Sequence, residues 1–171
     1  MQATIIASPF DLSAANLGAS MPITHLENAL RAINKPVCDL AAIELGSTSK
    51  VFNLHLRNAG LNASDAEKIA SALSSVTLQG EPHLYSFSVS YNENIDEQGL
   101  RLLLNALPKN LVELGLVGCG FSDQAGAHIT SYMSSASDLR LVCVENNLFS
   151  SQMKLQIMQA IKVDQKCTVV V

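Results

Sequence analysis

The stretch that most constrains the fold runs from Leu111 to Met133, because the spacing of its apolar residues changes halfway along. In the first half these residues recur three and two positions apart, which predicts a short strand and a tight turn. In the second half they recur four positions apart, which places them on one face of a helix. The apolar positions are Leu111, Leu114, Leu116, Cys119 and Phe121, then Ala125, Ile129 and Met133. A strand–turn–helix unit of this size cannot cover its own apolar faces, so it predicts stacked copies of itself.

Further copies of this unit are present in the chain. Three carry the same strand, turn and helix pattern, and an N-terminal one carries a worn version with smaller residues. The clear copies start at Val51, Leu84, Leu111 and Leu139, and the last three of these starts are almost evenly spaced. The strand and turn positions are Val51, Leu54, Leu56, Ala59 and Leu61; Leu84, Phe87, Val89, Asn92 and Ile95; Leu139, Val142, Val144, Asn147 and Phe149; and, in the worn copy, Phe10, Leu12, Ala15 and Leu17.

This pattern, LxxLxL followed by Asn or Cys and a helix, resembles the leucine-rich repeat. The repeat length of about 28 residues is similar to that of its ribonuclease-inhibitor subtype. The resemblance covers roughly residues 7 to 171. It implies an α/β solenoid of about five right-handed strand–turn–helix repeats plus a terminal strand, with a curved parallel sheet on the concave face and helices on the convex face. We therefore expect one domain over 1–171, with a divergent cap and irregular repeat at 1–50, four clear repeats at 51–161 and a closing strand at 162–171.

Capping residues predict where the helices begin. A first helix is expected from about Pro22 to Ile33, and Ser64 followed by Glu67 fits a capping box. The other expected N-caps are Asp96, Ser122 or Asp123, and Ser150 or Ser151. Residues 34–50 fit neither half of the unit, and their apolar residues, Leu40, Ile43 and Leu45, suit either a short strand or a helical turn. The final β-branched residues, CTVVV, predict a last strand at the edge of the sheet.

Composition excludes several classes of protein. With 48% hydrophobic and 15% charged residues, the chain builds a core and is not disordered. A net charge of −4 and scattered basic residues argue against a nucleic-acid surface. No apolar run reaches the length of a membrane span, and the start lacks the features of a Sec-type signal peptide. Four cysteines without CxxC spacing or His partners predict free thiols in a reducing compartment, so we expect a cytoplasmic protein without metal or cofactor.

The solenoid implied by the resemblance turns the residues between the leucines away from the core. The residue after the first apolar position of each copy is Phe52, Tyr85, Val112 or Arg140, and these side chain types favour binding over a structural role. The alternative is that they only pack on one another across neighbouring strands. We predict a non-catalytic module that binds another protein through Phe52, His55, Arg57, Tyr85, Ser88, Tyr91, Val112, Glu113, Arg140 and Glu145.

Three other hypotheses stay open. Asp11, His55 and Ser88 follow the acid–base–nucleophile order of a hydrolase, but an open strand surface offers no oxyanion site. Self-association through Phe52 and Tyr85 would make a homodimeric scaffold in place of a monomer that awaits its partner. The resemblance also extends to effectors that intracellular bacterial pathogens deliver into host cells, which would make the partner a host protein.

Overall fold

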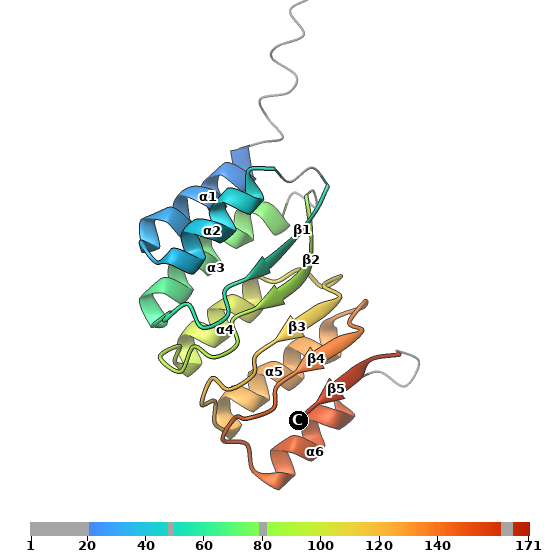
Figure 1. Cartoon of the computed structure of the whole chain (residues 1–171). Coiled ribbons are helices and arrows are strands. Elements are labelled where there is room, and N and C mark those ends of the chain that lie inside the picture. Colours follow the sequence, from blue (N-terminus) through green and yellow to red (C-terminus); the bar gives the residue numbers. More distant parts are fainter. Residues whose placement is uncertain (1–20, 48–49, 79–81, 162–165) are drawn as a thin grey trace, which may run out of the picture.

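The computed structural model describes residues 21–47, 50–78, 82–161 and 166–171, and these residues form an α/β structure. Five parallel strands make one sheet whose spatial order, β1-β2-β3-β4-β5, is the order of the chain. The strands are β1 (Val51–His55), β2 (His83–Ser88), β3 (Glu113–Gly115), β4 (Leu141–Cys143) and β5 (Thr168–Val170). The helices are α1 (Met21–Ile33), α2 (Pro36–Leu45), α3 (Ala63–Thr77), α4 (Glu97–Ala106), α5 (Asp123–Ser135) and α6 (Ser151–Gln159). Figure 1 shows the strands side by side, with the helices stacked along one side of the sheet.

The core lies between the sheet and these helices. One row of strand residues crosses the sheet and is at most 1% exposed: Leu54, Phe87, Leu114 and Val142. The connecting helices supply fully buried side chains at Ile69, Leu103, Ile129 and Ile157. Burying such side chains contributes roughly 1.5–3 kcal/mol each before the conformational entropy of folding is subtracted. The predicted α/β class with a parallel sheet is therefore confirmed.

A buried polar ladder holds the turns that follow the strands. Asn92 and Asn147 occupy the turn position at which Cys119 stands in the unit between them. Each carboxamide donates to a carbonyl of its own unit and to one of the preceding unit, and it accepts an N–H of the preceding unit. The thiol of Cys119 donates to a carbonyl of the preceding unit in the same way, at 3.4 Å from Val89 O. Since buried backbone groups need partners, these side chains allow consecutive turns to stack.

The expected exposure of Phe52 is wrong. Phe52 is 4% exposed and belongs to the core, whereas Val51 is 56% exposed. The cause is a shift in register: Phe52 pairs with Leu84, but Asn53 pairs with Ser86. In β1 two positions separate Phe52 from Leu54, whereas in β2 three positions separate their partners Leu84 and Phe87. Because side chains alternate along β1, Phe52 points to the same face as the buried Leu54.

The N-terminal part differs from a regular unit. The expected first copy, Phe10 to Leu17, lies outside the described residues. The helix predicted for residues 22–33 is confirmed as α1. Residues 36–45, for which a strand or a helical turn remained open, form the helix α2, with a proline at its start. Leu40 and Ile43 lie on its solvent face, 62% and 59% exposed.

One predicted helix cap is wrong and one is displaced. The cap of α3 is Asn62, whose Oδ1 accepts the N–H of Asp65 at 3.0 Å, while Asp65 Oδ2 accepts the N–H of Asn62 at 3.2 Å. Ser64 already lies inside the helix, so its predicted box with Glu67 does not form. Ser122 precedes α5 without a capping bond, and Asp123 instead accepts the N–H of Ser150 at 2.8 Å in the next unit.

The cap Asp96 is as predicted, and of the two alternatives Ser150 and Ser151 the structure has Ser150 as the cap of α6. Asp96 accepts the N–H of Gly99 at 2.7 Å, and Ser150 accepts the N–H of Met153 at 3.1 Å. The expected last strand is present as β5, which pairs with β4 at the end of the sheet. All four cysteines, which lie within the described ranges, are free thiols.

Candidate functional site

The outward side of the sheet, which we call the strand face, presents a row of side chains from consecutive strands. The N–H of Val112 donates to Tyr85 O at 3.0 Å, and the N–H of Arg140 donates to Val112 O at 2.8 Å. These bonds place the three residues next to one another, as the sequence predicts. Tyr85 is 40% exposed, Arg140 is exposed and Val112 is half-buried. The row therefore offers an aromatic ring, an apolar side chain and a guanidinium side by side.

The next rows of the strand face carry His55, Ser88 and Glu113. His55 lies opposite Ser88 in the strand register, yet its Nε2 is 2.8 Å from the hydroxyl of Ser86. The hydroxyl of Ser88 is instead 3.1 Å from that of Ser90. The structure therefore brings His55 to a different serine from the one that a His55–Ser88 hydrolase needs, and Asp11 lies outside the described residues.

Where the strands end, Arg57, Tyr91 and Gly118 form a stack across three consecutive units, which we call the turn cluster. The guanidinium carbon of Arg57 lies 4.3 Å from the centroid of the Tyr91 ring, a cation–π distance. On the Gly118 side, a Cβ added to that glycine would lie 3.0 Å from two atoms of the ring. A side chain at position 118 would therefore push the ring by a few tenths of an ångström, in addition to the strain of the positive φ at that glycine.

The backbone of Tyr91 is strained. Its φ is +61°, in the left-handed region that a bulky aromatic residue rarely adopts. The equivalent positions in the other units are Asn58, Gly118 and Asn146, and all three also have positive φ. Asparagine and glycine tolerate this conformation at low cost, so the unit containing Tyr91 carries the least suitable residue of the four.

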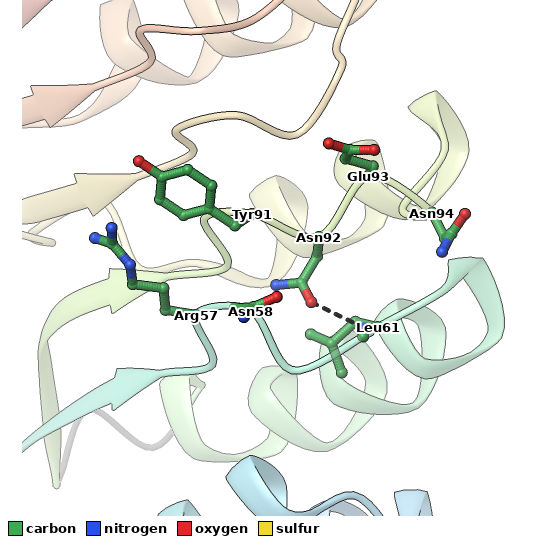
Figure 2. Close-up of a pocket in the computed structure, with 8 residues that line it drawn as sticks. Arg57, Asn58, Leu61, Tyr91, Asn92, Glu93 and Asn94 are labelled. Carbon is green, nitrogen blue, oxygen red and sulfur yellow. Dashed lines mark hydrogen bonds between the residues drawn. The ribbon is translucent and has the colours of Figure 1, made fainter.

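A hollow of about 510 Å³ lies beside the turn cluster (Figure 2). Figure 2 shows Arg57 and Tyr91 on one side of it, Glu93 and Asn94 on the other, and the buried Asn92 at the base. Sequence reasoning found Arg57 and Tyr91 but missed Asn58, Glu93 and Asn94. The signal for Asn58 was its place two residues after the last strand leucine, the position that has a left-handed backbone in each of the four units, and no comparable signal pointed to Glu93 and Asn94.

The far end of the strand face is acidic and partly apolar. Glu113 is half-buried on β3, and Glu145 follows β4. The Oε2 atom of Glu145 is buried without a hydrogen-bond partner among the described residues. Burial raises the pKa of the neighbouring Cys143 thiol, and the charges of Glu145 and Glu113 raise it further. The carboxylates of this face thus lie on β3 and after β4, while its guanidinium groups lie after β1, at Arg57, and before β4, at Arg140.

Within the described ranges, no group of three or more His, Cys, Asp or Glu side chains is arranged to hold a metal ion. None of the helices described has the length and apolar character to span a membrane. Comparison with protein-family models and with curated protein sequences finds no match for this chain.

Proposed function

We propose that this chain is a leucine-rich repeat solenoid of the ribonuclease-inhibitor type that binds another protein through its strand face and turn cluster. The repeat pattern, the in-order parallel sheet and the Asn and Cys side chains within the turns support the solenoid. Protein binding without catalysis is the activity that an open row of Tyr85, Val112 and Arg140 supports best, because the row offers contact area and no enclosed reaction site.

The observation that carries this proposal is the turn cluster. A left-handed tyrosine costs about 1–3 kcal/mol of backbone strain, and that cost is tolerated where surrounding structure fixes the residue. Tyr91 is 38% exposed as a residue, so core burial does not explain the conformation. The Arg57 guanidinium lies over the ring, and the backbone of Gly118 lies close to the ring edge, so the ring packs against both neighbouring units. A partner would meet an aromatic side chain that loses little freedom on binding.

The partner would contact Arg57, Tyr91 and Tyr85 as anchors, with His55, Ser88, Val112, Glu113, Arg140 and Glu145 around them. Phe52 is removed from the predicted set because it is buried. Its burial also removes the homodimer contact that pairs Phe52 with Tyr85.

The test compares partner capture by the wild-type chain with capture by Tyr91→Asn and Tyr85→Ala variants. Tyr91→Asn installs the residue found at positions 58 and 146, so it should relieve strain and leave the chain at least as stable. Binding should nevertheless weaken by about 1 kcal/mol or more for either variant, measured by titration against the captured partner. Gln98→Ala and Asn105→Ala on the exposed side of α4 are the matched controls.

The stability readout makes the test specific. A Tyr91→Asn chain that is both more stable and unimpaired in binding would mean that the strained ring serves no partner. If the α4 control variants lost binding while the Tyr91 and Tyr85 variants kept it, the binding site would lie on the helices.

A further inference from the structure

A polar hollow of about 200 Å³ lies between α4 and α5, which are neighbours in the row of helices (Figure 1). Arg101 of α4 and His128 of α5 line it, together with Lys109 from the connection that follows α4. The exposed residues Ser131 and Ser135 add hydroxyl groups. No Asp or Glu among the described residues lines this hollow, although the whole chain has 15 acidic and 11 basic residues. The hollow therefore gathers cations and hydroxyls in a chain whose net charge is negative.

The guanidinium and ammonium groups of the hollow keep unused donors. Arg101 Nε donates to Gln98 Oε1 at 3.0 Å, and Lys109 Nζ donates to Ser135 Oγ at 2.7 Å, so each group bonds to a neutral acceptor. A guanidinium carries five N–H donors and an ammonium three. Neither Arg101 nor Lys109 forms an ion pair within the described ranges. Both groups thus have charge and donors available to a ligand.

Packing orients Lys109 toward the hollow. Its Nζ lies 5.0 Å from the centroid of the Tyr132 ring, and the hydroxyl of Tyr132 donates to Pro108 O at 2.7 Å. Tyr132 is 4% exposed, so the ring is part of the packed structure. The hydroxyl of Ser135, which accepts from Nζ, itself donates to Tyr132 O at 2.8 Å. Because these contacts already restrict the ammonium, it loses less freedom when a ligand binds.

The acidic side chain that contacts this group of residues already has a partner. Glu97 Oε1 is 3.1 Å from His128 Nε2, and the two form an ion pair when the imidazole is protonated. Glu97 precedes Arg101 by one helical turn, yet no ion pair joins them in the structure. The charges of Arg101 and Lys109 are therefore not compensated by the carboxylate beside them.

The repeat itself does not require these cations. Arg101 lies five residues after the N-cap of α4, and the corresponding residues of α3, α5 and α6 are Glu67, Ala127 and Leu155. Lys109 has a structural role, because a cation beside the last turn of α5 interacts favourably with the helix dipole. That role does not extend to Arg101, which lies in the middle of α4. Their convergence on one hollow thus favours a bound anion.

We propose that the hollow between α4 and α5 binds a phosphate monoester group, with Arg101 and Lys109 on its oxygens and the hydroxyl of Ser131 as a further donor. A phosphate monoester carries about two negative charges near pH 7 and three acceptor oxygens. Two cations from different elements match that charge, and charge-assisted bonds to phosphate are strong. A carboxylate has one charge and two oxygens, so it would leave one of the cations uncompensated.

The size of the hollow limits what enters it. Its volume of about 200 Å³ is below the roughly 300–1,000 Å³ of pockets that enclose a whole small molecule. The phosphoryl group therefore enters, and the rest of the ligand stays outside. A phosphorylated side chain and free phosphate share this chemistry, and the experiment distinguishes them. The site lies on the helix side, so it does not depend on partner binding through the strand face.

NMR titration of the full chain tests the site, with N-acetyl-O-phosphoserine amide and inorganic phosphate as the probes at constant ionic strength. We expect saturable shifts of the backbone amides around the hollow, and none with N-acetylserine amide. Arg101→Gln/Lys109→Gln should raise the dissociation constant roughly tenfold or more. Lys68→Gln/Lys154→Gln removes the same charge from α3 and α6 and is the matched control, so it should change that constant by less than about twofold. Circular dichroism checks that each variant is folded.

A second variant tests the hollow without removing a cation. Ser131→Asp places a carboxylate among the proposed ligand contacts, at an exposed position where it should not disturb folding. It should weaken binding of both probes roughly tenfold or more, because the carboxylate competes for the two cations. Tighter binding of the phosphoserine amide than of inorganic phosphate would support a phosphorylated side chain as the source of the group. The opposite order would support free phosphate.

Three results would overturn the proposal: no saturable shift with either probe, shifts confined to residues away from α4 and α5, or an equal loss of affinity in the Lys68→Gln/Lys154→Gln control. The last result would mean that the anion responds to net charge alone. None of these outcomes bears on partner binding through Tyr91, which is measured separately.

Discussion

Replacing Asn92 with alanine should destabilise the chain more than its position in a turn suggests. Asn92 is 1% exposed and bonds to the backbone of two units. Its Oδ1 accepts the N–H of Leu61 at 2.9 Å, and its Nδ2 donates to Leu56 O at 2.8 Å and to Val89 O at 2.7 Å. The carboxamide therefore ties the second clear unit to the first.

These bonds do not count equally. A fourth and longer one, from Asn92 Nδ2 to Ser90 O at 3.3 Å, ends on a carbonyl that also accepts the N–H of Asn58. Val89 O also accepts the thiol of Cys119, so it keeps a partner in the variant. The N–H of Leu61 and the carbonyl of Leu56 lose the partner that Asn92 supplies. Each such loss costs about 1–1.5 kcal/mol, and the cavity left by the carboxamide adds to it. We expect Asn92→Ala to lower the free energy of unfolding by about 3 kcal/mol.

Urea denaturation followed by circular dichroism measures this change as a shift of the midpoint. Asn94→Ala, two residues along the same turn at an exposed position, is the control and should change the free energy of unfolding by less than about 0.5 kcal/mol. Asn92→Cys introduces the residue that stands at position 119 and should fall between the two, because a thiol donates but accepts only weakly. A loss below about 1 kcal/mol for Asn92→Ala would refute the reasoning that the turn ladder stabilises the stack.

Two further predictions follow from local geometry. Asn62→Ala should lower the free energy of unfolding by about 1 kcal/mol and Ser64→Ala should hardly change it, because the capping box of α3 is formed by Asn62 and Asp65. Urea denaturation measures both, and a larger loss for Ser64→Ala would place the start of the helix two residues later. Burial raises the pKa of the Cys38 thiol from 9.0 to about 11, so its thiolate fraction at pH 8.5 is about a hundredfold below that of an exposed thiol. After treatment with an alkylating reagent, mass spectrometry should find Cys38 unmodified in the folded chain and modified in urea. Equal labelling in both would contradict its burial.

Sequence periodicity predicted those features that repeat. Leu114 and Val142 lie in the core as expected, because in both units the next apolar residue comes two positions later. The cap Asp96 was also predicted correctly, and Ser150 was one of two predicted alternatives, since each directly precedes a helix with a regular apolar stripe. The orientation of Phe52 was not predicted. The repeat pattern assumes equal spacing in every unit, so it does not reveal a register shift at one strand pair.

Features that arise from contacts between units could not be predicted from the sequence either. Asp123 looks like a local helix cap, but it bonds to Ser150 of the next unit. The site at the turn depends on the approach of Arg57 to Tyr91 of the following unit, and on the space that Gly118 leaves. A glycine at position 118 indicates a tight turn, and it gives no sign of the ring that lies against it.

The order of the sheet bears on how the molecule would yield to a pulling force. Among the strands described, each pairs only with the strands before and after it in the chain, so force applied at Val171 reaches β5 first and leaves β1 paired. A chain with this strand order should unfold from its end in successive steps, each releasing about one unit. A sheet whose neighbouring strands are distant in the sequence would instead unfold in one step. Under force applied at this end, the first unit to detach would be the one that contains α6 and β5, and a partner bound to that unit would raise the force needed for the first step.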